Sequence, residues 1–170
     1  MKKISFLMAI AVAFLLSNNL QAQTGTVSLK LMPVQTIALN TTDINLTYST
    51  ATDYSAGKDS INSNQLTCFS SCPFQITVQT TAVTANMPAV TLKPSAGSTV
   101  LGGTPTYASA LNVNSISSAT PFITSAVGSN NATFNIEYKA PVIDVSTNTL
   151  SNSASGITYT AHLTYTIVPQ

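Results

Sequence analysis

The stretch Gly156-Ile-Thr-Tyr-Thr-Ala-His-Leu-Thr-Tyr-Thr-Ile-Val-Pro169 alternates with a period of two along its whole length. Successive side chains of a strand face opposite sides of its sheet, so one face of this segment can be buried while the other meets water. The face that we expect to be buried carries Ile157, Tyr159, Ala161, Leu163, Tyr165 and Ile167. The other face carries threonines and His162. A strand of this length needs partners, which the earlier part of the chain must supply.

The N-terminus has the pattern of an export signal. Two lysines precede an apolar run over residues 4–16, and a small residue, Ala22, stands before the expected cleavage site. We therefore expect a signal peptide over residues 1–22 and a mature chain over 23–170. The run is short for a bilayer span, so an uncleaved anchor is the weaker alternative.

No second long apolar run follows, so we expect no transmembrane segment after signal cleavage. The sequence thus predicts an exported protein, extracellular or at the cell surface, with the periplasm as an alternative. The expected mature chain has few charged residues and no arginine. A basic patch that could hold phosphates is absent from this composition, so nucleic acid is not expected as a partner.

Short period-two segments separated by turn signals recur along the chain and predict an all-β protein. The expected strands cover 27–31, 37–39, 44–48, 65–69, 74–78, 90–92, 107–113, 132–139 and 156–169. The polar stretch 51–64 is expected to be a loop, and no helical stripe follows the signal peptide. We predict one domain over 23–170, an Ig-like antiparallel β-sandwich, with the strand around Phe134 paired to the final strand. Its core is expected to contain Leu29, Leu46, Phe74, Ile76, Val78, Phe134, Ile136, Leu163 and Ile167.

The two cysteines, Cys68 and Cys72, lie in the sequence Cys-Phe-Ser-Ser-Cys-Pro. In an exported chain a disulfide is the default, and here it would cross-link the tip of a hairpin between strands 65–69 and 74–78. The alternatives are a redox pair or a metal pair. A metal pair would need further soft ligands, and the chain has one histidine and no other cysteine.

Few side chains have the spacing that catalysis or cofactor binding requires. His162 falls on the threonine-rich face of the last strand, where a solvated residue is expected rather than a triad member. Residues 53–59 have oxygen ligands and a glycine, but a lysine in the same loop argues against calcium. Glu137 and Asp144 are weak candidates for a carboxylate pair. We therefore predict no enzyme activity, no cofactor and no metal.

Two aromatic residues, Tyr54 and Tyr107, lie in or near predicted loops. Aromatic side chains on loops can bind sugars or proteins, although they more often pack within the protein. These two tyrosines are the basis of an alternative prediction, in which the protein is a secreted binding module that recognises glycan or protein through its loops.

Segments at both ends of the mature chain resemble known surface domains. Residues 27–40, 44–48 and 53–57 resemble exported Ig-like proteins of Bacteroidetes-type bacteria. Residues 156–167 resemble the closing strand of pilin-like, spore-coat-U-like and WxL-type β-sandwich domains. The resemblance implies a structural or adhesive surface subunit, a pilin-like protein whose partners are other copies of itself or surface proteins.

A pilin-like subunit implies a donor strand, that is, an N-terminal segment that completes the sheet of the next subunit. In this sequence the candidate donor residues are Val27, Leu29 and Leu31. The alternative is that the same residues pair within their own chain. The resemblance thus leaves two arrangements open for this segment.

Overall fold

The computed structural model describes residues 26–146 and 156–170. The chain divides into two compact units, residues 1–32 and residues 33–170, and the helices and strands given below all lie in the second. The predicted signal peptide, residues 1–22, lies outside the described residues. Across the described ranges, no helix has the length and apolar character needed to cross a membrane.

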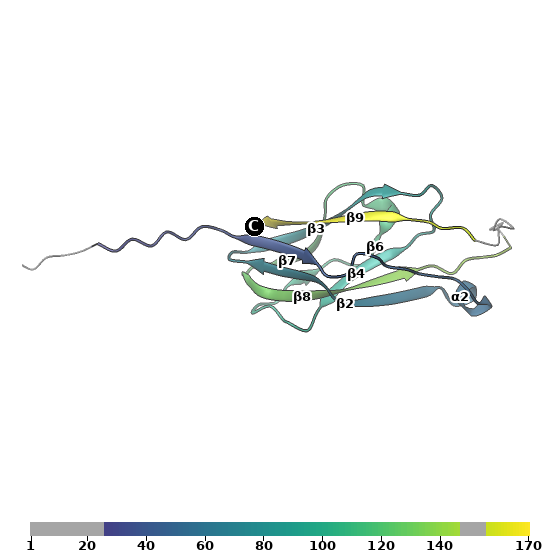
Figure 1. Ribbon diagram of the computed structural model, residues 1–170, viewed down its shortest axis with the longest axis horizontal. Coiled ribbons are helices and arrows are strands. Elements are labelled where there is room, and N and C mark those ends of the chain that lie inside the picture. Colours follow the sequence, from purple (N-terminus) through teal and green to yellow (C-terminus); the bar gives the residue numbers. More distant parts are fainter. Residues whose placement is uncertain (1–25, 147–155) are drawn as a thin grey trace, which may run out of the picture. The chain divides into compact units, whose positions relative to one another are not determined.

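Two antiparallel sheets make up the second unit (Figure 1), which confirms the all-β fold class. The first sheet has the order β1 (Gln35–Leu39), β2 (Lys58–Ser70), β8 (Ser129–Ala140), β4 (Thr91–Ala96) and β6 (Leu111–Asn112). The second has the order β5 (Thr106–Tyr107), β7 (Thr120–Ser125), β3 (Phe74–Val83) and β9 (Ala161–Pro169). A short helix, α2 (Ala51–Ala56), and a 3₁₀ helix, η1 (Val113–Ser115), lie in the connections.

The core lies between the two sheets and takes inward-facing side chains from both. The tyrosine ring of Tyr107 in β5 meets Phe134 in β8 edge-on, with ring centroids 6.4 Å apart, so the sheets contact each other directly. Of the predicted core, Phe74, Ile76, Val78, Phe134 and Ile136 are fully buried, and Leu46, Leu163 and Ile167 are partly buried against them. The prediction for Leu29 is wrong, because that side chain is 82% exposed.

The last strand has the predicted alternation but begins later and has a different partner. From Ala161 onward the apolar residues are shielded and His162 and the threonines are exposed. The strand starts at residue 161 rather than 156, and Ile157 is 43% exposed. β9 pairs with β3, in the register Ile76↔Ile167, whereas β8 pairs with β2 and β4. The predicted pairing with the Phe134 strand is therefore wrong.

The segment between Cys68 and Pro73 connects the two sheets. β2 belongs to the first sheet and β3 to the second, so the predicted hairpin is also wrong. The chain passes from one sheet to the other over residues 71–73, and both strands then place their apolar residues in one core. Alternation alone cannot distinguish this arrangement from a hairpin, because both bury one face of each strand.

The polar stretch 51–64, predicted as a loop, instead forms α2 and the first half of β2. Gly57 joins them with φ of +81°, and a Cβ atom there would lie 2.7 Å from the carbonyl oxygen of Ala140. Only glycine tolerates both the positive φ and this close approach. β2 then runs antiparallel to β8 from the Lys58↔Ala140 pair onward.

Two segments predicted as strands belong to neither sheet. Residues 27–31 and 44–48 both alternate in sequence, yet neither is hydrogen-bonded into a ladder. Between them, β1 forms as predicted around residues 37–39 and pairs with the second half of β2.

Candidate functional site

Residues 26–32, the described part of the first unit, carry the most exposed apolar side chains of the described chain. Val27 is 96% exposed, and Leu29 and Leu31 are each 82% exposed. Ser28 and Lys30 occupy the alternate positions, so an extended segment would have one apolar and one polar face. Such a segment is suited to a half-buried strand, but it has no strand partner in its own described chain.

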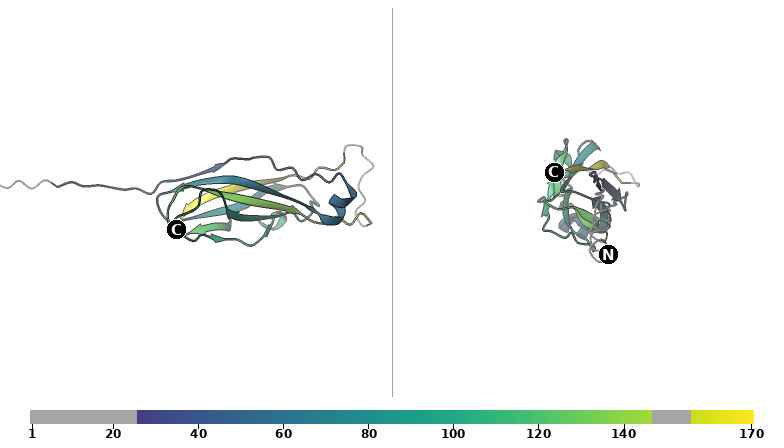
Figure 2. Two further views of the ribbon diagram at one scale, coloured as in Figure 1. Left: turned by 90° about the horizontal axis from the view of Figure 1, so that it is seen from below. Right: turned by 90° about the vertical axis from the view of Figure 1, so that its left-hand side faces the viewer.

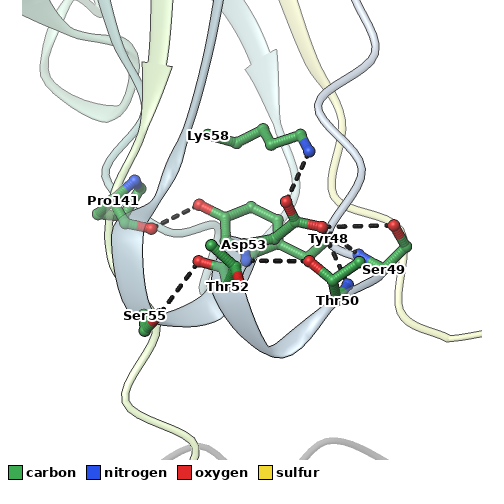
Figure 3. A network of polar contacts seen from close by, with 8 residues as sticks. All are labelled: Tyr48, Ser49, Thr50, Thr52, Asp53, Ser55, Lys58 and Pro141. Carbon is green, nitrogen blue, oxygen red and sulfur yellow. Dashed lines mark hydrogen bonds and ion pairs between the residues drawn. The ribbon is translucent and has the colours of Figure 1, made fainter.

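Tyr54, which was predicted to lie in or near a loop, lies in α2 and packs against other residues of the same chain. Its ring contacts Tyr48, with ring centroids 5.3 Å apart, and its carbonyl oxygen accepts a hydrogen bond from the backbone N–H of Ile143 at 3.0 Å. The Tyr48 hydroxyl in turn donates to the carbonyl oxygen of Pro141 (Figure 3). These contacts connect the helix to the chain that leaves β8.

Asp53 holds this region together electrostatically, as Figure 3 shows. Its carboxylate accepts hydrogen bonds from the backbone N–H groups of Ser49 and Thr50, each at 2.9 Å, and pairs with the Lys58 ammonium at 2.7 Å. In the reverse direction, the side-chain hydroxyl oxygen of Thr50 accepts a hydrogen bond from the backbone N–H of Asp53, which completes a capping box. The Lys58 ammonium, followed by these N–H groups, lowers the pKa of Asp53 well below its usual range. The Asp53 carboxylate therefore stabilises the local structure through these contacts. The prediction that residues 53–59 bind no calcium remains an expectation.

The second loop tyrosine, Tyr107, lies in β5 and is half-buried against the core. It pairs with Ile123 of β7 and packs on Phe134, and burial raises its pKa. Tyr54 and Tyr107 therefore contact different parts of the fold. Neither ring is a free aromatic platform, and the predicted ligand site through these loops stays a prediction.

Both cysteines are free thiols in this structure, so the predicted Cys68–Cys72 disulfide is not formed. Cys68 lies in β2 with its side chain fully buried in the core, and burial raises its pKa to about 11. Cys72 lies past the strand end, where its sulfur is 3.7 Å from Nε2 of Gln35 and 3.9 Å from Oγ of Ser70. The two thiols therefore lie in different surroundings, one in the core and one past the end of the strand.

The other candidates for chemistry are dispersed. His162 is exposed on β9, Glu137 lies in β8, and Asp144 binds the backbone N–H and hydroxyl of Ser146. Within residues 26–146 and 156–170, no three histidine, cysteine or acidic side chains gather to hold a metal ion.

Comparison with protein-family models, curated proteins and solved structures gives no match for this chain. The arrangement of its own residues is therefore the basis for any functional proposal.

One feature of the structure was missed by the sequence reasoning. β1 covers only the second half of β2, so residues 58–64 have no strand partner among the described residues on the side away from β8. The segment beside this edge covers residues 41–48, of which residues 44–48 were predicted to be a strand. Its alternation was read correctly, but a sequence pattern carries no information on whether a backbone partner is available.

Proposed function

We propose that this protein is an exported, non-enzymatic surface subunit with an Ig-like sandwich, and that copies of it assemble through residues 26–32. The observation that carries the proposal is the exposed, alternating apolar face of Val27, Leu29 and Leu31. Removing a valine or leucine side chain from water is worth about 1.5–3 kcal/mol. An added strand in a neighbouring copy would bury this face and also pair its backbone.

Low charge supports the same proposal. Charged residues make up 6% of the chain, and Lys58 and Asp53 already neutralise each other in an ion pair. Copies with so few like charges repel each other weakly, which favours close stacking. The alternative function, a glycan-binding or protein-binding module, has less support because Tyr54 and Tyr107 pack within the protein.

Size-exclusion chromatography with light scattering of the mature chain, residues 23–170, tests the proposal. We expect oligomers or polymers for the wild-type protein and monomers for the double variant Leu29→Asp/Leu31→Asp. A matched control, Ser28→Asp/Lys30→Asp, changes the polar face of the same segment and should keep the assembly.

Thermal unfolding of the same variants separates the two arrangements that the sequence left open. If residues 26–32 act between copies, the monomeric double variant keeps a folded domain with a nearly unchanged Tm. Loss of the fold in that variant would mean that the segment pairs within its own chain. A wild-type protein that stays monomeric at every concentration would also refute the proposal.

Export is tested separately. The proposal expects the protein outside the cytoplasm with Gln23 as its first residue, which fractionation and mass spectrometry of the intact protein would establish. An unprocessed N-terminus in the cytoplasm would contradict it.

A further inference from the structure

A seam lies along the second unit where the two sheets meet at their edges. β1 is the outer strand of the first sheet and is in contact with β9, the outer strand of the second. Past the end of β1, the edge of the first sheet is the side of β2 residues 58–64 that no described strand pairs with. Residues 41–48, which we call the strap, run along this side of the unit toward α2 (Figure 2).

The strap fills the seam with side chains but does not join either sheet. Ile44 and Leu46 are half-buried and pack against the core, while Asn45 and Thr47 between them are exposed. No part of the strap belongs to the strands of either sheet in the described chain. Among the described residues, apolar contact with the core is therefore what holds its middle.

The hydrogen bonds of the strap region gather at its ends. At one end the Asn40 side-chain amide donates to the carbonyl oxygen of Asn64 at 2.7 Å and to the Thr67 hydroxyl at 2.8 Å. At the other end the Tyr48 hydroxyl donates to the carbonyl oxygen of Pro141. A segment fixed at two ends and held by side chains between them can leave the seam without breaking a backbone ladder.

The exposed N-terminal segment has the same binary pattern as the strap. Val27, Leu29 and Leu31 alternate with polar residues, as Ile44, Leu46 and Tyr48 do. A segment with this pattern can fill the seam with its apolar face. By pairing with the free edge of β2 it would also gain the ladder of backbone hydrogen bonds that the strap does not form with any described strand.

We propose that the seam is an acceptor site for residues 26–32 of a second copy of this chain. In the free subunit the strap occupies this site until that segment binds. The incoming segment adds as a strand on the free edge of β2 residues 58–64, and Ile44 and Leu46 leave the core. This inference rests on the proposed function, because it names the surface through which the copies assemble.

Cross-linking of the full mature chain locates the acceptor. A photoreactive benzophenone amino acid replaces Leu29, and heavy-isotope-labelled and unlabelled copies are mixed before irradiation. Mass spectrometry then distinguishes links between copies from links within one chain. We expect links between copies that map to residues 58–64 or to the strap.

The other outcomes distinguish the two proposals. Links between copies that map elsewhere would overturn the acceptor site and leave the assembly function standing. Links confined to single chains, or no assembly at all, would overturn both.

Weakening the strap gives a second test. Leu46→Ala removes apolar contact from the strap and leaves the β2 edge intact, so assembly should become about tenfold faster or more. Asn45→Ala, an exposed position in the same segment, should leave the rate unchanged. Assembly by a still folded Leu46→Ala protein that is unchanged or slower would overturn the proposal.

Discussion

Leu66 and Ile61 lie in the same strand, β2, yet Leu66 is fully buried and Ile61 is 63% exposed. Leu66 stands opposite Phe134 of β8 and packs in the core, whereas Ile61 faces outward. The contribution of an apolar residue in this protein is therefore decided by the face on which it lies. Both residues have the same chemistry, so they form a matched pair for mutation.

We expect Leu66→Ala to lower the free energy of unfolding by about 2–5 kcal/mol, because it leaves a cavity in the core. The control Ile61→Ala should cost less than about 1 kcal/mol, since its side chain gains little from burial. Urea unfolding followed by circular dichroism measures both. Equal losses for the two variants would contradict the assignment of the faces.

The two thiols give a second prediction at this scale. Cys72 should react with a thiol reagent in the folded protein, while Cys68 should react only after unfolding, because it is buried and its pKa is raised to about 11. Mass spectrometry after labelling with and without denaturant measures this. If neither cysteine labels in denaturant until a reductant is added, the exported protein contains the disulfide.

Among the elements, α2 depends most on a few polar contacts. A helix of six residues has little intrinsic stability, and none of its residues is buried. The capping box of Thr50 and Asp53 and the ion pair to Lys58 hold it in place. The stability of this region therefore depends on the ionised form of one carboxyl group.

We expect Asp53→Asn to lower the Tm at neutral pH and to lose its effect in acid. The folded-state pKa of Asp53 lies below the unfolded value of about 3.9, so the ionised carboxylate stabilises the fold above that value. This contribution is lost as the pH falls from about 4 toward the folded-state pKa. Thermal unfolding of both proteins across this range is the measurement.

Asp59→Asn is the matched control, because Asp59 is an exposed carboxylate a few residues away. It should change the Tm little at any pH. A difference between wild-type protein and Asp53→Asn that stays constant from neutral pH to about pH 2 would contradict the role of the ionised group.

At the scale of the whole second unit, a tyrosine pair joins the two sheets. The hydroxyl groups of Tyr138 in β8 and Tyr165 in β9 lie 3.1 Å apart in a hydrogen bond. Both phenols are neutral at ordinary pH, and burial raises the pKa of each further. The bond adds a polar contact between the sheets to the apolar core that they share.

A double-mutant cycle with Tyr138→Phe and Tyr165→Phe measures this connection. We expect each single variant to cost about 1–3 kcal/mol, because it leaves a shielded hydroxyl without its partner. The double variant should cost less than the sum of the two, with a coupling energy of about 0.5–1.5 kcal/mol. Strict additivity would show that the hydroxyl groups do not interact in solution.

Sequence patterns alone determined which face of β8 and of β9 is buried. The alternation of β9 and of β8 predicted the shielded residues correctly, since a period of two is a local property of an extended chain. The all-β class followed from many such segments. The capping box around Asp53 was also present in the sequence, although residues 51–64 were predicted as a loop.

Only the tertiary structure decided which strands pair and which segments remain outside the sheets. β8 and β9 lie in different sheets, and residues 27–31 and 44–48 alternate like strands without entering either sheet. Pairing depends on which backbone edges are free after distant parts of the chain have come together, and this is a non-local property. The same reason leaves Cys68 buried in the core and not bonded to Cys72, although only three residues separate them in the sequence.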